Sequence, residues 1–213
     1  MDKPNAPDSK AVDDKDLELP DIEFVAQGTF SIHNPETSSA PITWAAAEFK
    51  LGGEQRELIK AEDIDAVRSH TLSLLQQAQG SLCIYSPDLE PWLYNHSCIQ
   101  QACSAFLLAH PKNTLRILLR DTSRIARDGH ALLALSHRLS SRCSIRKVNT
   151  EYDYAEDAWL IADDCGLLAR KAQQLHKAVV YYHDPARVQQ SQRAFNAMWD
   201  VSQTDVNLRS MPI

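Results

Sequence analysis

Charged and hydroxyl side chains follow an apolar run of the chain in a pattern suited to binding an anion. Residues 115–119 predict a strand, and Thr122 and Ser123 come soon after it as N-cap residues of a helix. The N–H groups at the start of a helix attract an anion, and arginine adds a forked, charged donor. The segment predicts a site for a phosphate or an acidic partner, with the members Arg120, Thr122, Ser123, Arg124, Arg127 and His130.

The charge around this segment favours the same interpretation. Residues 115–147 contain eight Lys and Arg side chains and two Asp side chains, whereas the whole chain of 213 residues has a net charge of −6. The acidity belongs to residues 1–57, which hold twelve acidic and five basic side chains. An alternative stays open, in which the arginines lie on a solvated helix face and pair with Asp121, Asp128 or the acidic N-terminal segment.

A second group of polar residues, Ser86 and Asp88, follows another predicted strand at residues 82–85. Ligands of α/β proteins bind beyond the carboxyl ends of strands, so these residues extend the candidate site. If the two strands are neighbours, Asp88 and Arg120 lie close together. They would then either line a ligand site or form an ion pair between two loops.

Metal and cofactor chemistry has little support in the sequence. His130 and His137 share a helix face but lack a third ligand. Asp163 and Asp164 stand before a glycine between two apolar runs, which is typical of a turn. The five cysteines form no CxxC pair and are expected to be reduced, mostly buried thiols. We expect no metal and no cofactor, and we assign no catalytic residue.

These residues must be positioned by alternating helices and strands arranged around a central hairpin. The hairpin spans residues 155–170, with strands at 159–162 and 167–169. The periodicity predicts further strands at 82–85, 115–119, 144–148 and 178–182, and helices at 60–79, 99–109, 124–140 and from Pro185 onward. Helices between the early strands imply parallel crossovers, and the hairpin adds antiparallel pairing. The predicted fold class is therefore α/β, a mixed sheet flanked by helices on both faces.

The composition divides the chain into four parts. Residues 1–20 have the composition of a disordered acidic tail, and residues 21–55 form an extension in which two strands are expected. The α/β domain is expected over residues 56–202, followed by a short tail at 203–213. The sequence has no apolar run long enough to span a membrane and no targeting signal, so a cytoplasmic location is expected.

The order of elements over about residues 56–202 resembles one half of a phospholipase D-like domain. The resemblance is carried by SLCIYSPDLEP, LRILLRDTSRIARDGHALLALSHRL, AWLIADDCGLLAR and HDPARVQQSQRAFNAMWDVS. In weaker form, the same segments resemble a family of uncharacterised bacterial proteins. Catalytic members of the phospholipase D family carry HxKxxxxD and a later Gly-Ser. The resemblance implies that the His forms a phosphohistidine and the Lys neutralises the phosphate.

This chain keeps only one of those residues. Asp163 matches the aspartate, but Glu156 stands at the His position and Ala158 at the Lys position, and the Gly-Ser positions are Arg170 and Lys171. A glutamate with no cation beside it would repel a phosphate. Catalysis by the family mechanism is therefore not expected.

Three functions are weighed for such a chain. The first is a non-catalytic binding or regulatory domain that takes an anionic ligand or an acidic protein partner. The second is a phosphodiesterase or nuclease with a rebuilt site using Glu156, Asp163 and Arg127. The third is a nucleic-acid-binding module, which the near-neutral charge of the domain disfavours. Because the resembling enzymes assemble two halves, a homodimer is also expected.

Overall fold

The computed structural model describes residues 43–54, 56–149, 152, 157–171, 174 and 176–208, all within the unit Ser39–Ile213. The strands are β1 (Ile59–Ala61), β2 (Ser81–Ser86), β3 (Thr114–Leu119), β4 (Cys143–Lys147), β5 (Ala158–Ala162), β6 (Gly166–Arg170) and β7 (Ala178–Tyr181). The helices are α1 (Ile64–Gln77), α2 (Pro91–Tyr94), α3 (Ser97–Ala109), α4 (Ser123–Asp128), α5 (Ala131–Arg138) and α6 (Pro185–Val201), and a 3₁₀ turn spans Val206–Leu208.

The seven strands form one mixed sheet in the order β1-β7-β6-β5-β2-β3-β4. The pairs β2–β3 and β3–β4 are parallel and are joined by helical crossovers, whereas the other neighbours are antiparallel. The central strands are almost wholly buried, which explains why they read as apolar runs rather than alternating patterns.

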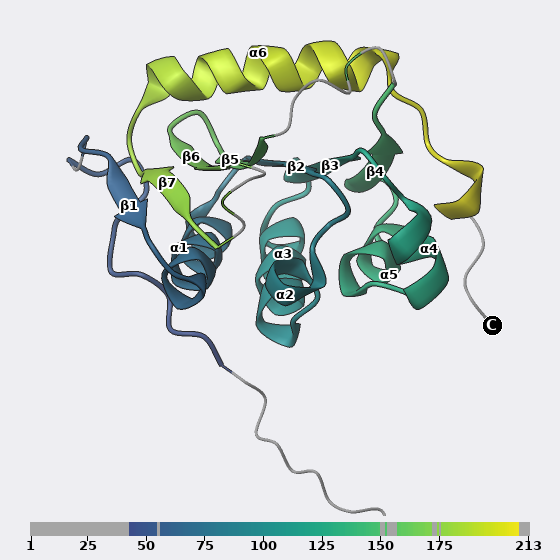
Figure 1. The fold of residues 1–213 in the computed structure, drawn as a ribbon, viewed down its shortest axis with the longest axis horizontal. Helices are drawn as coiled ribbons and strands as arrows, with labels where there is room; N and C mark the ends of the chain where they lie inside the picture. The colour runs from purple at the N-terminus through teal and green to yellow at the C-terminus, as the bar shows by residue number, and fades with distance from the viewer. Residues whose placement is uncertain are drawn as a thin grey trace, which may run out of the picture. The chain divides into compact units, whose positions relative to one another are not determined.

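Helices cover the two faces of the sheet unequally. The single long helix α6 lies across one face, and α1 to α5 lie on the other (Figure 1). Two apolar clusters correspond to these layers: a large one under α1 to α5 and a smaller one under α6 that includes Phe195 and Met198. The predicted α/β class, with helices on both faces of a mixed sheet, is confirmed.

The predicted hairpin and final helix are also confirmed, and local residues explain both. The β5–β6 turn places Asp163 at φ 54°, a conformation that Asp tolerates better than most residues. Gly166 pairs with Ala162 across the hairpin, where a Cβ on Gly166 would lie 2.5 Å from the Leu51 side chain. Asp184 caps α6 by accepting a hydrogen bond from the Arg187 N–H, with a proline at the first helical position.

The helix predicted at 124–140 is two helices, so that prediction was wrong in its continuity. Gly129 adopts φ 73°, outside the helical region, and His130 follows in an extended conformation. The chain therefore turns between α4 and α5, and α5 packs beside β4. Glycine, which has no Cβ, permits this turn at little cost.

Two further elements differ from the sequence prediction. Residues 59–61 form the edge strand β1 rather than the start of a helix, and a short helix α2 follows the loop after β2. In the extension, the first expected strand lies outside the described residues. The described part of the second, residues 43–49, is irregular chain that is bonded to α1, as when the Ala47 N–H donates to the Ser69 carbonyl. In the described part of the chain, no helix is long and apolar enough to cross a membrane.

Candidate functional site

The segments that carry the expected site residues follow the ends of the neighbouring strands β2 and β3. These two strands are parallel, and Ser86 is paired with Leu119. Because β5 is antiparallel to β2, and β6 to β5, Ala158 and Arg170 lie at the same end of the sheet, where β2 and β3 finish. We call this group of loop and strand-end residues the strand-end site.

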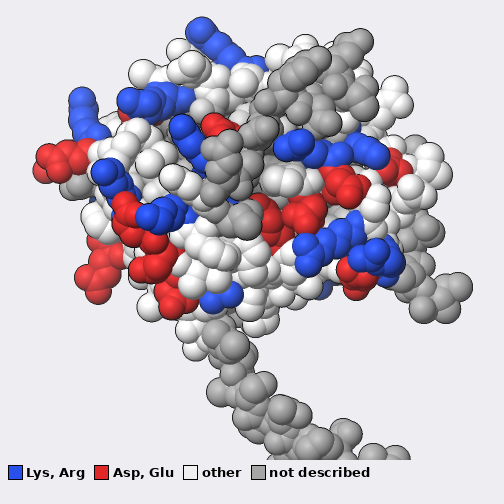
Figure 2. Space-filling view, in the orientation of Figure 1, with Lys and Arg blue, Asp and Glu red and all other residues white. Residues whose placement is uncertain are grey.

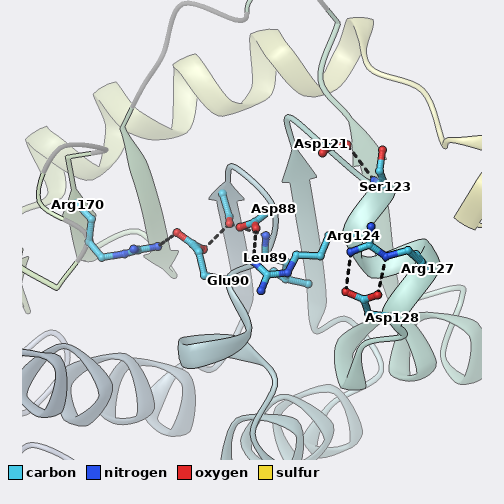
Figure 3. A network of polar contacts seen from close by, with 10 residues as sticks. Asp88, Leu89, Glu90, Asp121, Ser123, Arg124, Arg127, Asp128 and Arg170 are labelled. Carbon is cyan, nitrogen blue, oxygen red and sulfur yellow. Dashed lines mark hydrogen bonds and ion pairs between the residues drawn. The ribbon is translucent and has the colours of Figure 1, made fainter.

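A buried ion pair lies at its centre (Figure 3). The Arg170 Nη2 donates to the Glu90 Oε1 at 2.6 Å, and the two side chains are only 3% and 8% exposed. The second Glu90 oxygen accepts from the buried Ser86 hydroxyl at 2.6 Å. The Arg170 guanidinium also lies 5.4 Å from the Trp92 ring centroid, within cation–π range. Each of the two buried charges thereby has an opposite charge as its partner.

Small side chains make room for this pair. Ala158 is buried directly opposite Arg170 in the β5–β6 register. Ala61 and Ala178, also buried, face each other across β1 and β7 at the same edge. Ala158 therefore places only a methyl group beside an arginine that is already bound to a carboxylate.

An exposed ion pair lies beside the buried one. The Arg124 Nη1 lies 2.8 Å from the Asp88 Oδ2, with 49% of the Arg124 side chain exposed. Asp88 is thus paired with Arg124, whereas the ion-pair alternative weighed from the sequence had Arg120 as its partner. Arg120 is half-buried, and its backbone N–H donates to the Ser86 carbonyl. Arg127 pairs with the adjacent Asp128 at the surface.

The hydroxyl groups expected to cap a helix have other partners. The Thr122 hydroxyl donates to the Asp205 Oδ2 at 2.5 Å, and this bond lowers the pKa of the Asp205 carboxyl. The Ser123 N–H donates to Asp121, which lowers the pKa of Asp121. Thr122 stands at the N-cap position of α4, as predicted, but its side chain makes no capping hydrogen bond. Asp121 comes two residues before Ser123, and its carboxylate accepts the Ser123 N–H that would otherwise be free to bind an anion.

His130 has a structural position. Its Nδ1 accepts from the Leu132 N–H and caps α5, and burial lowers the pKa of the ring to about 4. The ring stays neutral at neutral pH, so it supplies no charge to an anion.

Of the two expected motif residues, Asp163 lies in the described part of the chain. The carboxylate of Asp163 accepts hydrogen bonds from the N–H groups of Gln79, Gly80 and Ser81 at 2.7–2.9 Å. These residues lead into the start of β2, whereas Ala158 lies where β2 finishes, so Asp163 and Ala158 are at opposite ends of the strands. Glu156 lies outside the described residues, which leaves the rebuilt site of Glu156, Asp163 and Arg127 without geometric support.

The remaining arginines of residues 115–147 are dispersed. Arg116 and Arg146 stack on aromatic rings of α6, Arg142 donates to the Leu107 carbonyl, and Arg138 donates to Ser104. On the face seen in Figure 2, basic and acidic side chains are interspersed rather than gathered into one basic field. The exposed positive charge near the strand-end site comes chiefly from Arg124 and Arg127 in α4.

In the described part of the chain, the cysteines form no disulfide and the possible metal ligands form no cluster. Burial raises the pKa of the Cys143 thiol to about 12 and that of Cys165 to about 11, and Cys103 shifts in the same direction. All five cysteines are unpaired, as expected, and three of them are buried. Within the described ranges, no three His, Cys, Asp or Glu side chains gather as a metal site.

Glu90 and Arg170 were missed as site residues. The available signal was slight: Arg170 is a charge that ends an otherwise apolar strand, and Glu90 precedes the Pro-Trp of α2. Because Glu and Arg are almost never fully buried unless paired, an arginine in such a run predicts a partner without saying which.

Comparison with known proteins gives one family and a set of similar folds. The family model described as domain of unknown function DUF7931 matches residues 63–211. No curated protein matches the chain.

Three solved structures have a similar fold. TrmBL2, an archaeal chromatin protein whose structure shows a novel mode of DNA binding, has a TM-score of 0.54 and 13% identity over 71% of this chain, which spans only 55% of TrmBL2. NucT from Helicobacter pylori has a TM-score of 0.51 and 11% identity, over 71% of this chain and 99% of NucT. Nuc from Salmonella typhimurium, a phospholipase D family member, has a TM-score of 0.49 and 16% identity, over 70% of this chain and 96% of Nuc. At these identities the likeness concerns the fold alone.

Proposed function

Because the chain belongs to the family of the domain of unknown function DUF7931, we propose its function from its own site: it is a non-catalytic binding or regulatory domain with a phospholipase D-like fold. Its working surface is the strand-end site, where the exposed Arg124 and Arg127 and the half-buried Asp88 lie beside the buried Glu90–Arg170 pair. Its occupant is an anionic ligand or an acidic protein partner.

The observation that carries the non-catalytic part is the buried ion pair beside Ala158. A phosphoryl group in transfer needs a cation that is able to contact its oxygens. Ala158 offers none, and Arg170 is 3% exposed and bound to Glu90. Opening that pair to admit a phosphate would leave a carboxylate buried without its partner, at a cost of several kcal/mol.

The binding part is supported by the exposed arginines of α4. The Asp88–Arg124 pair lies at the surface and is therefore weak, on the order of 1 kcal/mol or less. The Arg127–Asp128 pair is more exposed, so solvent and salt screen its attraction. An incoming carboxylate can replace Asp88 or Asp128 as the partner of an arginine at small cost. A partner with two or more adjacent carboxylates would engage both arginines at once.

Titration of the full chain with an oligoglutamate peptide tests this proposal. Binding is expected to weaken about tenfold or more in the Arg124→Glu/Arg127→Glu variant and to weaken with added salt. The matched control is Arg138→Glu, which reverses an exposed arginine of α5 away from the site. Equal affinity of the wild type and the double variant would contradict the working surface.

A separate assay tests the absence of catalysis. The full chain is incubated with bis(p-nitrophenyl) phosphate, with and without divalent metal ions. No turnover above that of a heat-inactivated sample is expected. Turnover that disappears in Glu156→Gln would overturn the non-catalytic assignment and restore the phosphodiesterase alternative.

A further inference from the structure

A cleft of about 1090 Å³ lies at the other end of the strands from the strand-end site. One wall is α6, and the other is formed by residues 79–81 and the β5–β6 turn. Arg116, from β3, also lines the cleft. The proposed function uses none of these residues.

Arg116 is a half-buried cation without a carboxylate partner among the described residues. Its Nη2 has one acceptor, the Cys83 sulfur at 3.4 Å. Its guanidinium carbon lies 5.2 Å from the Phe195 ring centroid and 5.5 Å from that of Trp199. The two rings fix the guanidinium under α6 and attract its charge.

Among the described residues, the Cys83 sulfur is the one hydrogen-bond acceptor of Arg116, and the other N–H groups of the guanidinium are available to solvent or to a ligand. A guanidinium has five N–H donors, and a thiol sulfur is a weak acceptor. The faces of the Phe195 and Trp199 rings offset part of the cost of partly removing the Arg116 charge from water. They accept no hydrogen bond from the N–H groups that point outward in the plane of the guanidinium. An oxyanion in the cleft would satisfy these donors in the bidentate geometry that arginine favours.

The wall formed by α6 carries polar side chains suited to hydrogen bonding with the uncharged part of such a ligand. Gln189, Gln192, Arg193 and Asn196 recur at the three- and four-residue spacing of one helix face, and all four line the cleft. The Gln192 amide nitrogen lies 3.0 Å from the Asn196 Oδ1 and 3.6 Å from the Cys83 sulfur, so this side chain reaches toward the position of Arg116. Arg193 is exposed and adds a second positive charge.

The composition of the cleft also limits the ligand. None of the described residues that line this cleft is aromatic, so they offer a nucleobase no ring on which to stack. The carboxylates of Asp163 and Asp164 lie on the opposite wall and would repel a polyanion. A small molecule with one anionic end and a polar, uncharged remainder fits both conditions.

We propose that this cleft is a binding site for a small organic anion, whose carboxylate or phosphate group is held by Arg116 and whose polar remainder is held by the amides of α6. Arg193 attracts the anion at the mouth of the cleft. The site is separate from the strand-end site and does not depend on the proposed function.

Calorimetric titration of the full chain with succinate and, separately, with inorganic phosphate tests the site. Saturable binding of at least one probe is expected, and the stronger probe identifies the anionic group as carboxylate or phosphate. Arg116→Met keeps much of the apolar stem but removes the charge, and it should weaken binding about tenfold or more. Arg193→Met should weaken it by a smaller factor, because Arg193 is exposed.

Two controls keep the outcome decisive. Arg138→Met removes an exposed arginine outside the cleft and should bind as the wild type does. Arg116→Lys keeps the charge without the fork and should bind with intermediate affinity, which serves as the test if Arg116→Met does not fold. The proposal is overturned if neither probe saturates, or if folded Arg116 variants bind like the wild type. Loss of oligoglutamate binding in the α4 variant bears on the proposed function alone.

Discussion

Arg170 and Glu90 are eighty positions apart in the sequence, yet the Arg170 Nη2 lies 2.6 Å from the Glu90 Oε1 inside the protein. The pair joins the end of β6 to the loop after β2, on either side of β5. The centre of the strand-end site is therefore held by a buried contact between segments that are far apart in the sequence.

Removing one partner of this pair should be more harmful than removing both. Glu90→Gln or Arg170→Met should each lower the free energy of unfolding by about 3 kcal/mol, because each leaves a buried charge without its partner. The double variant Glu90→Gln/Arg170→Met should lose less than the sum of the two. Urea unfolding of the four proteins measures this coupling.

The exposed pair of Asp88 and Arg124 provides the comparison. Asp88→Asn and Arg124→Gln should each change the free energy of unfolding by about 1 kcal/mol or less. Additive effects of the Glu90 and Arg170 substitutions would show that the buried charges are not coupled.

His130 should make the protein less stable in acid. Burial lowers the pKa of its ring from 6.5 to about 4, so the unfolded chain binds a proton at a pH at which the folded chain does not. Stability from this group is complete above pH 6.5 and is lost as the pH falls toward 4, to a total of about 3 kcal/mol. Below that range the contribution is constant.

The substitution His130→Asn isolates this effect. Asparagine supplies a side-chain acceptor to cap α5 but does not titrate. The difference in unfolding free energy between wild type and variant, measured by urea at a series of pH values, should therefore shrink as the pH falls. A difference that is constant from pH 7 to 4 would contradict the assignment.

Asp163 should matter for stability. Asp163→Ala removes the acceptor of three N–H groups and places alanine at a positive φ, and we expect a loss of about 2 kcal/mol. Asp163→Asn keeps an acceptor and tolerates the backbone conformation, so it should lose less. Thermal unfolding of the two variants ranks them, and an equal loss would count against the role of the turn geometry.

The homodimer also stays a prediction. Sedimentation equilibrium of the full chain at micromolar concentration should give a mass near that of two chains of 23.9 kDa. A single species of one-chain mass throughout that range would refute it.

The central sheet was predictable because buried strands produce short apolar runs with clear ends. β2, β3 and the β5–β6 hairpin have such runs, and Asp184 and Pro185 mark the start of α6. β1 was missed because three residues with an exposed Lys60 at their centre carry no distinguishable period. The break at Gly129 was missed because the apolar spacing continues across it.

The site was predicted only in part, for a different reason. Ser86, Asp88 and Arg124 were placed together because the ends of neighbouring parallel strands must meet. The contact of Arg170 with Glu90 depends on how antiparallel β5 and β6 join β2 in the sheet, and no local pattern specifies it. The partners of Thr122 and Arg116 are likewise set by segments far along the chain, at Asp205 and in α6.

The strand β1 has a consequence for any shortened form of the protein. Its residues 59–61 precede residue 63, where the family match begins, and they pair with the outer side of β7. A chain trimmed to the matched segment would leave the main-chain N–H and C=O groups of β7 open to another molecule. Such a fragment should self-associate or precipitate through that edge, whereas a chain that begins before Ile59 keeps it closed.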